Sequence, residues 1–68
     1  TKTTAEQQGY VVASIADIGR VTAGSLLEEF GTVEAVMTAR EDDLLEADGV
    51  GEVTAEKMRE IVGSEYEP

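Results

Sequence analysis

The apolar positions of this 68-residue chain recur every three or four residues, which is the spacing of an amphipathic α-helix. No stretch alternates strictly between apolar and polar residues, as a half-exposed β-strand would. Five helices are predicted, with bounds near 5–14, 20–30, 33–38, 41–46 and 52–62. The pattern therefore predicts an all-α domain of short helices joined by tight turns.

Threonine and glycine mark several of the predicted helix ends. Thr4 is a candidate N-cap for the first helix and Thr32 for the third, because a threonine hydroxyl accepts a hydrogen bond from an amide of the first turn. Gly31 follows the second helix, where a left-handed residue commonly ends a helix. Gly9 lies inside the first helix and weakens its helical propensity.

The segment Gly49-Val50-Gly51 lies directly before the last predicted helix. Glycines adopt backbone angles that other residues avoid, so we expect a tight reversal here, with Val50 pointing into the core. Because neither glycine has a side chain, the amides at the start of the next helix are expected to be open to solvent. Free amides and the positive end of a helix dipole form a site for a phosphate group.

A second copy of this pattern lies 32 residues earlier in the chain. At the turn and the helix start, Gly19, Val21, Thr22 and Ala23 match Gly51, Val53, Thr54 and Ala55, and further on Glu28 matches Glu60 and Gly31 matches Gly63. An internal repeat in so short a chain predicts two helix–turn–helix units, about 5–31 and about 32–64, within one domain. The shared alanine is expected to let the two helices of each unit pack closely.

The two copies differ in their charged residues. Asp17 stands where the second copy has Gly49, and its carboxylate is expected to weaken phosphate binding at the first turn. Arg20 either offsets this carboxylate or is solvated. Lys57 either reaches toward the second phosphate site or pairs with Glu60, three residues along the same helix.

The chain is strongly acidic, with 15 Asp and Glu residues, 5 Lys and Arg residues and a formal net charge of −10. This balance indicates either a basic partner or adaptation to a salt-rich cytoplasm, and the scarcity of lysine favours salt adaptation. Three of the five basic residues, Arg20, Lys57 and Arg59, lie within the two repeated motifs. Arg59 lies across its helix from Lys57 and is expected to face a neighbouring helix or solvent.

Several function classes receive no support from the sequence. The chain has no cysteine or histidine, and the acidic run Glu41-Asp42-Asp43 lacks the ligand spacing of a calcium loop. We therefore expect no metal site, no cofactor and no catalytic site within this segment. No apolar run approaches the roughly 20 residues that span a bilayer. The first residue is Thr rather than Met, from which we expect a domain cut from a longer protein.

These motifs resemble the tandem helix-hairpin-helix domain of the SAM/RuvA C-terminal type, and nearly the whole chain fits. The segments Ser25 to Val36 and Leu44 to Gly51 look like the C-terminal domain of archaeal Hef nucleases, in the XPF group of structure-specific endonucleases. The bacterial UvrC C-terminal domain has a similar pattern. The acid-rich composition suits a haloarchaeal member.

The resemblance implies an accessory module that binds branched or forked DNA, or single/double-strand junctions, without sequence preference in a cytoplasmic, nucleoid-associated protein. In the family, hairpin amides hold backbone phosphates across the minor groove, and the nuclease and helicase motifs lie outside this segment. The DNA-binding positions of the second hairpin are Gly49, Val50, Gly51, Thr54 and Lys57. The first hairpin matches less well, and its positions are Ile18, Gly19, Arg20, Thr22 and Ser25.

The resemblance also implies a homodimer, with contacts at Ile61 near the end of the last helix and at Tyr66 beyond it. A different function is a pure protein–protein dimerisation or docking module with little DNA affinity. Asp17, and Glu52 immediately after Gly51, favour that alternative. A helix-hairpin-helix glycosylase would need a longer chain and a catalytic Lys/Asp pair beyond the second hairpin.

Overall fold

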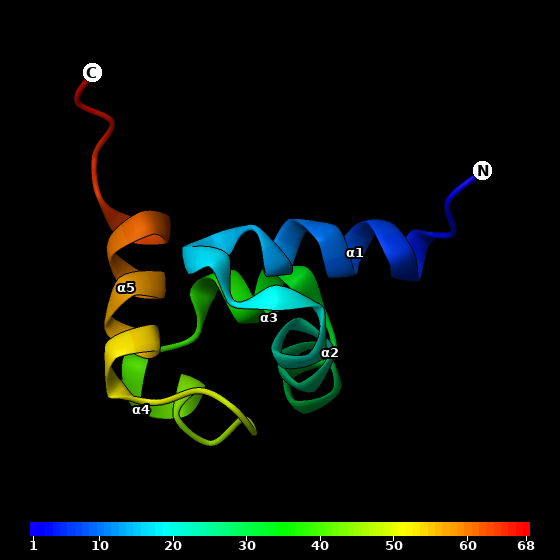
Figure 1. The fold of residues 1–68 in the computed structure, drawn as a ribbon. Helices are drawn as coiled ribbons and strands as arrows, with labels where there is room; N and C mark the ends of the chain where they lie inside the picture. Colours follow the sequence, from blue (N-terminus) through cyan, green and yellow to red (C-terminus); the bar gives the residue numbers. More distant parts are fainter.

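The computed structural model describes residues 1–68, and the chain contains helices and no strands. The elements in chain order are α1 (Thr4–Ala13), the short 3-10 helix η1 (Ile15–Asp17), α2 (Gly19–Phe30), α3 (Val33–Thr38), α4 (Glu41–Leu44) and α5 (Glu52–Gly63). Figure 1 shows α1 lying across α2 and α3, with α5 standing to one side. The predicted all-α fold of five helices is confirmed, and η1 is an additional turn. None of the helices has the length and apolar character that a membrane span requires.

The first helix begins one residue earlier than predicted, because Thr3 rather than Thr4 is its N-cap. The Glu6 amide donates to the Thr3 hydroxyl at 3.1 Å, and the Thr3 amide donates to the Glu6 carboxylate at 3.0 Å. A Thr4 cap would have Gln7 as its partner, and a carboxylate is the stronger acceptor. The hydrogen bonds with Thr3 lower the pKa of Glu6 below its usual value.

The corner between α2 and α3 forms as the sequence predicts. Gly31 has a left-handed φ of 86°, and its amide donates to the Leu27 carbonyl at 2.8 Å. Thr32 then caps α3, since its hydroxyl accepts a hydrogen bond from the Ala35 amide at 2.9 Å. These two neighbouring residues end one helix and start the next.

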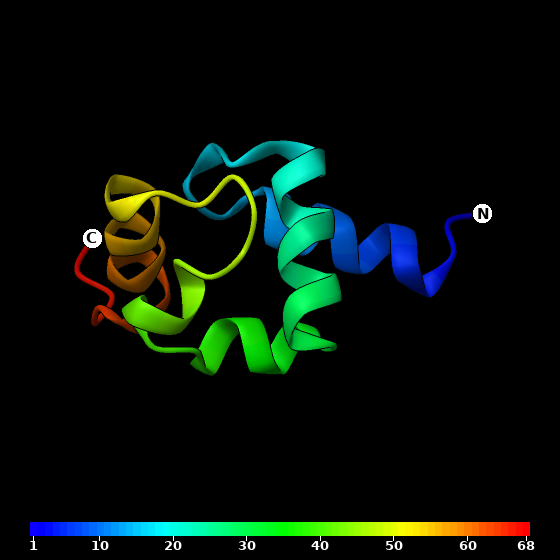
Figure 2. The same cartoon turned by 90° about the horizontal axis from the view of Figure 1, so that it is seen from below.

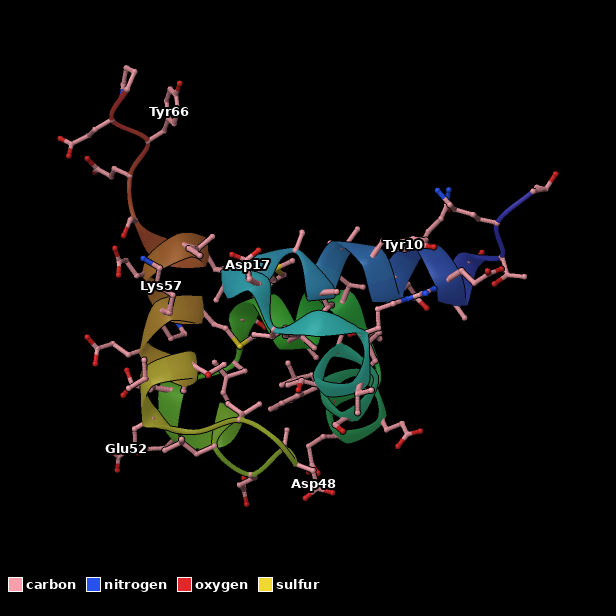
Figure 3. The ribbon with its side chains drawn as sticks, in the orientation of Figure 1. Tyr10, Asp17, Asp48, Glu52, Lys57 and Tyr66 are labelled. Atoms are coloured by element: carbon pink, nitrogen blue, oxygen red, sulfur yellow. The ribbon has the colours of Figure 1, made fainter.

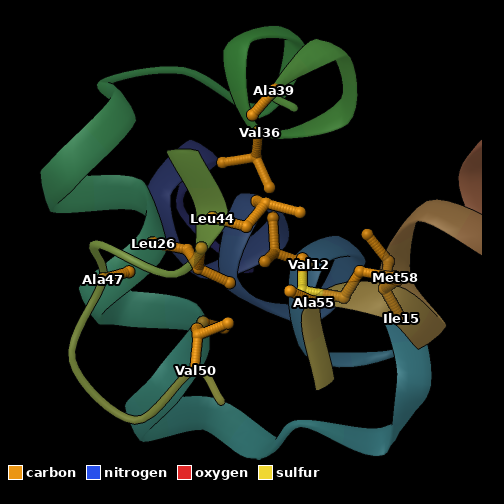
Figure 4. Packing of buried hydrophobic residues seen from close by; sticks show 11 residues of the cluster. Val12, Ile15, Leu26, Val36, Ala39, Leu44, Ala47, Val50, Ala55 and Met58 are labelled. Atoms are coloured by element: carbon orange, nitrogen blue, oxygen red, sulfur yellow. The ribbon is translucent and has the colours of Figure 1, made fainter. Parts of the chain in front are cut away.

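Eleven buried apolar side chains, from all six elements and from the connections between them, form one core (Figure 4). They are Val12, Ile15, Ala23, Leu26, Val36, Ala39, Leu44, Ala47, Val50, Ala55 and Met58. The repeat-related Ala23 and Ala55 are fully buried, as expected for closely packed helices. Val50 is also buried and anchors the loop before α5, which confirms its predicted inward orientation.

Each hairpin packs against the second helix of the other repeat unit. η1, in the first hairpin, packs against α5. In the second hairpin, a Cβ placed on Gly49 would lie 3.0 Å from the hydroxyl oxygen of Thr22, in the first turn of α2. Figure 2 shows the loop before α5 (yellow) curling toward the start of α2. Asp17 of η1 and Gly49 are equivalent repeat positions, so the contact between the units is reciprocal.

Gly49→Ala is expected to lower the free energy of unfolding by about 1–3 kcal/mol, because a left-handed alanine costs roughly 1–2 kcal/mol and its methyl group would crowd Thr22. Urea unfolding followed by circular dichroism measures this change. Gly24→Ala is the matched control, since Gly24 lies inside α2 with open space at its Cβ. That substitution is expected to stabilise the fold by about 0.5–1 kcal/mol. Equal stability of Gly49→Ala and the wild type would contradict the packing described here.

Candidate nucleic-acid interface

The second hairpin presents a run of four unpaired backbone amides. The Val50 amide closes the turn by donating to the Ala47 carbonyl at 3.2 Å. The Ala55 amide makes the first helical bond of α5, to the Gly51 carbonyl at 2.9 Å. Between them, the amides of residues 51–54 donate to no acceptor in the protein, and no side chain caps the helix. Such amides at the positive end of a helix dipole suit a phosphate group.

The two glycines of this hairpin have different roles. Gly49 has a φ of 86°, a left-handed conformation that favours glycine. Gly51 has φ −99° and ψ 179°, an extended conformation that any residue adopts. The expectation that Gly51 also supplies special backbone angles is therefore wrong. The space around its Cβ position is open, so what Gly51 contributes is the absence of a side chain beside the free amides.

The first hairpin reverses the chain in a similar way with different residues. Ala16 and Asp17 have φ values of 54° and 52°, and Gly19 has a φ of 81°. Aspartate tolerates the left-handed region better than most residues, so Asp17 adopts the conformation that glycine has in the second hairpin. The Ile18 amide donates to the Ile15 carbonyl, and the amides of residues 19–21 donate to no acceptor in the protein.

Carboxylates lie close to both hairpins. Figure 3 shows Asp17 in the first hairpin, with Asp48 and Glu52 near the two ends of the second. All three residues are exposed to solvent. An exposed carboxylate repels a phosphate through the Coulomb interaction, and dissolved salt screens this repulsion. Dissolved salt therefore weakens the repulsion that these carboxylates exert on an anion at the free amides.

The basic residues of the two motifs are held by nearby groups. Lys57 Nζ lies 3.8 Å from the Glu60 carboxylate, and both side chains are more than half exposed. The predicted pairing of Lys57 with Glu60 is thus formed, and an exposed pair of this kind contributes only about 0–1 kcal/mol. Arg59 donates to the Met37 carbonyl at 2.8 Å, which links α5 to the end of α3 and confirms that it faces a neighbouring helix.

Arg20 is exposed to solvent, as one of the two alternatives had it, and it also contacts Tyr10. Its guanidinium donates to the Tyr10 hydroxyl at 3.3 Å and lies 5.0 Å from the centre of the Tyr10 ring. Lys2 Nζ also lies over this ring, at 4.8 Å. Arg20 is therefore oriented by an aromatic side chain of α1 rather than by Asp17 or by solvent alone. The sequence alone does not indicate this contact, because Tyr10 belongs to a different helix.

The hydroxyl and apolar positions of the motifs lie in varied surroundings. Ser25 donates to the Val21 carbonyl at 3.3 Å. It also lines a pocket of about 190 Å³ whose other lining residues are all acidic, namely Glu28, Glu29, Glu46 and Asp48. No group of acidic side chains in the structure is placed to hold a metal ion. Thr22 and Thr54 are half-buried at the two helix starts, and Ile18 is half-buried against the core.

The spacing of apolar residues along α2 does not by itself mark Val21 as a surface residue. Val21 and its repeat equivalent Val53 are both strongly exposed. The signal that could have identified them is their position two residues before the buried alanines Ala23 and Ala55. Two residues correspond to about 200° around a helix, which places each valine on the face opposite to the core.

Comparison with known proteins extends these observations. A family model described as the SAM-like helix-hairpin-helix tandem matches residues 11–62. A protein of Methanocaldococcus jannaschii that is named as an ATP-dependent RNA helicase is 47% identical over 62 residues, covering 91% of this chain and 8% of that protein. The DNA ligase of Methylococcus capsulatus is 47% identical over 45 residues, covering 66% of this chain and 7% of the ligase.

Solved structures show the same arrangement of helices. XPF from Aeropyrum pernix superposes with a TM-score of 0.91 at 34% identity, covering 98% of this chain and 32% of that chain. A structure of the same XPF in complex with DNA gives a TM-score of 0.88 at 35% identity, covering 96% of this chain and 32% of that chain. The expected tandem fold and the resemblance to archaeal XPF-type proteins are confirmed. This chain spans less than a third of the XPF chain and less than a tenth of the helicase.

Proposed function

Because this chain belongs to the SAM-like helix-hairpin-helix tandem family, we propose that it is a DNA-binding module that holds backbone phosphates without reading base sequence. The observation that carries this proposal is the run of unpaired amides at residues 51–54. The similar XPF from Aeropyrum pernix, which was solved in complex with DNA, supports it. The module would direct a nuclease or helicase to branched or forked DNA, or to single/double-strand junctions, with the catalytic groups located outside these residues.

In the proposed complex the second hairpin is the principal contact. A phosphate is held by the amides of residues 51–54, from Gly51 to Thr54. Gly49 and the buried Val50 shape the loop. Lys57 exchanges Glu60 for a DNA phosphate, which is a small change because the exposed pair is weak. A backbone amide binds a phosphate without carrying a positive charge, so a protein with few basic residues can use this mode of binding.

The first hairpin contributes a weaker contact in this proposal. The amides of Gly19 and Arg20 are free, and Ile18 anchors the loop as Val50 does in the second copy. Thr22 and Ser25 complete this group of positions. The Asp17 carboxylate lies beside the free amides and opposes the approach of a phosphate.

The strong acidity supports a haloarchaeal origin, as the scarcity of lysine also does. At about 1 M salt the screening length is about 3 Å, which suppresses repulsion between DNA and exposed carboxylates. Salt also weakens phosphate binding, by roughly 0.9 log units in affinity per contact for each tenfold rise in concentration. One module would therefore bind weakly, and two linked modules would gain affinity through effective concentration.

A homodimer would provide the second module. Ile61 is 49% exposed on α5, and Tyr66 is 88% exposed in the segment that follows it. Exposed apolar side chains that gather into one patch mark contact surfaces. We propose that these two residues contribute to the contact between two copies of the domain.

A protein-docking module without DNA affinity is the second candidate. The observation that favours it is the position of Asp17, Asp48 and Glu52 around the two hairpins. Under this alternative the acidic side chains would exclude DNA, and the fold would serve only to dimerise or to bind a basic protein. Addition of a DNA fork would then shift no amide resonances between residues 49 and 57.

Lys57→Glu is expected to reduce affinity for a DNA fork and for a plain duplex by about tenfold at low salt, and to lower the salt slope by about 1. Fluorescence anisotropy at several salt concentrations measures both quantities. Arg40→Glu produces the same change in net charge at the start of α4 and serves as the control. Equal losses for the two variants would indicate a response to total charge alone, and would contradict a specific contact at Lys57.

Asp17→Asn is expected to raise DNA affinity about threefold at low salt, because it removes one carboxylate from the first hairpin and asparagine also tolerates the left-handed conformation. The gain should shrink as salt is added. Asp42→Asn, which removes one exposed charge from α4, is the control. An unchanged affinity for Asp17→Asn in the same anisotropy titration would show that the first hairpin lies outside the interface.

Ile61→Glu is expected to weaken dimerisation at least tenfold, because a charge would be buried at the contact. Sedimentation equilibrium measures the dimer dissociation constant. Val11→Glu on α1 is a suitable control, since Val11 is 47% exposed. A monomeric wild type, or an Ile61→Glu variant that dimerises like the wild type, would remove Ile61 from the proposed interface.

A further inference from the structure

Two valines are far more exposed to solvent than most of the other large apolar side chains at the surface. Val21 is 87% exposed and Val53 is 83% exposed. Apart from Tyr66 in the C-terminal segment, the other large exposed apolar side chains, Tyr10, Val11 and Ile61, are all less than half exposed. A β-branched apolar side chain that is almost wholly in water gains nothing from the fold itself.

The two valines occupy the same position in the two repeat units. Val21 lies two residues after Gly19, the first residue of α2, and Val53 lies two residues after Gly51, the N-cap of α5. Each is in the first turn of its helix. Each also belongs to the run of amides that have no acceptor in the protein. An apolar side chain is thus placed within each candidate phosphate site.

The packing of the fold brings the start of α2 against the loop of the second hairpin. Thr22, which follows Val21, faces Gly49 of the second hairpin. Val53 lies four residues after Gly49, in the first turn of α5. The reciprocal packing of η1 on α5 completes this arrangement. Because each valine belongs to one of the two runs of free amides, a DNA duplex that contacts both runs would meet both valines.

We propose that Val21 and Val53 are apolar contacts to the deoxyribose groups that adjoin the phosphates held by the hairpin amides. This inference rests on the proposed function and specifies the kind of contact it uses. The carbons of a deoxyribose are the apolar part of the DNA backbone, so they are the apolar surface nearest to a bound phosphate. When the amides around residue 53 hold a phosphate, the side chain of that residue lies against the sugar next to it. The repeated valine indicates the same contact at the first hairpin.

An apolar contact supplies something that the amides and Lys57 do not. Phosphate binding loses affinity steeply as salt is added, because DNA counterions are no longer released into dilute solution. Burial of apolar surface keeps its strength in salt and gains strength in many salts. For a domain with a net charge of −10, the valines would provide the part of the affinity that persists in concentrated salt.

The test compares wild type with Val21→Thr, Val53→Thr and the double variant, each titrated with a DNA fork and a duplex from low to high salt. Threonine keeps the β-branched shape and replaces one methyl group by a hydroxyl. Each single variant is expected to bind DNA about fourfold more weakly, because one methyl group fewer is removed from water on binding. The double variant is expected to bind about 15-fold more weakly. The ratio to wild type should stay constant across the salt series, and the salt slope should not change.

Val11→Thr on α1 is the matched control, and it is expected to bind like the wild type. Thermal unfolding and sedimentation of the double variant are expected to match those of the wild type, since neither valine is in the core. An altered dimer constant would assign the valines to a protein contact and overturn the inference.

Two further results would overturn the inference while leaving the proposed function intact. One is a double variant that binds DNA like the wild type at every salt concentration. The other is a loss confined to low salt with a shallower slope, which would indicate an electrostatic or conformational effect. A wild-type domain that binds neither fork nor duplex at low salt would be a different outcome. It would overturn the proposed function, and the inference would fail with it.

Discussion

The fold depends on the close approach between the second hairpin and the start of α2. Gly49 faces the Thr22 hydroxyl so closely that a Cβ at position 49 would lie 3.0 Å from it. The same glycine has a left-handed φ that reverses the chain before α5. One residue without a side chain therefore satisfies both a conformational and a packing requirement. With η1 packed against α5 in return, the two repeat units form one core of eleven residues instead of two small ones.

This packing also explains why the amides of the proposed phosphate site are free. Val50 is buried and its amide closes the turn, so the loop is held from within the core. The next four amides are then left at the helix start without a cap. A capping side chain in place of Gly51 would stabilise α5 by only about a few tenths of a kcal/mol, and it would occupy one of these amides. The absence of a cap is consistent with a helix start that serves a ligand.

The total charge of the domain differs from the character of the groups at its two hairpins. A net charge of −10 opposes a polyanion, yet the proposed contacts are backbone amides, one weakly paired lysine and two exposed valines. None of these groups depends on a large positive potential. Arg59, which carries one of the few positive charges, is used instead to join α5 to α3. The acidic surface and the hairpins can therefore have separate roles.

Sequence alone determined the helix pattern and the repeat, because both are visible in the local spacing of residues. It also determined the inward position of Val50 and of the two alanines, which recur at fixed places in the motif. It misjudged Thr4, where two adjacent threonines compete for one cap, and Gly51, whose angles are ordinary. Only the tertiary structure decided that Arg20 lies on Tyr10, because that contact joins residues of different helices. It also decided that the start of α2 meets the second hairpin, since packing between the repeat units has no trace in local spacing.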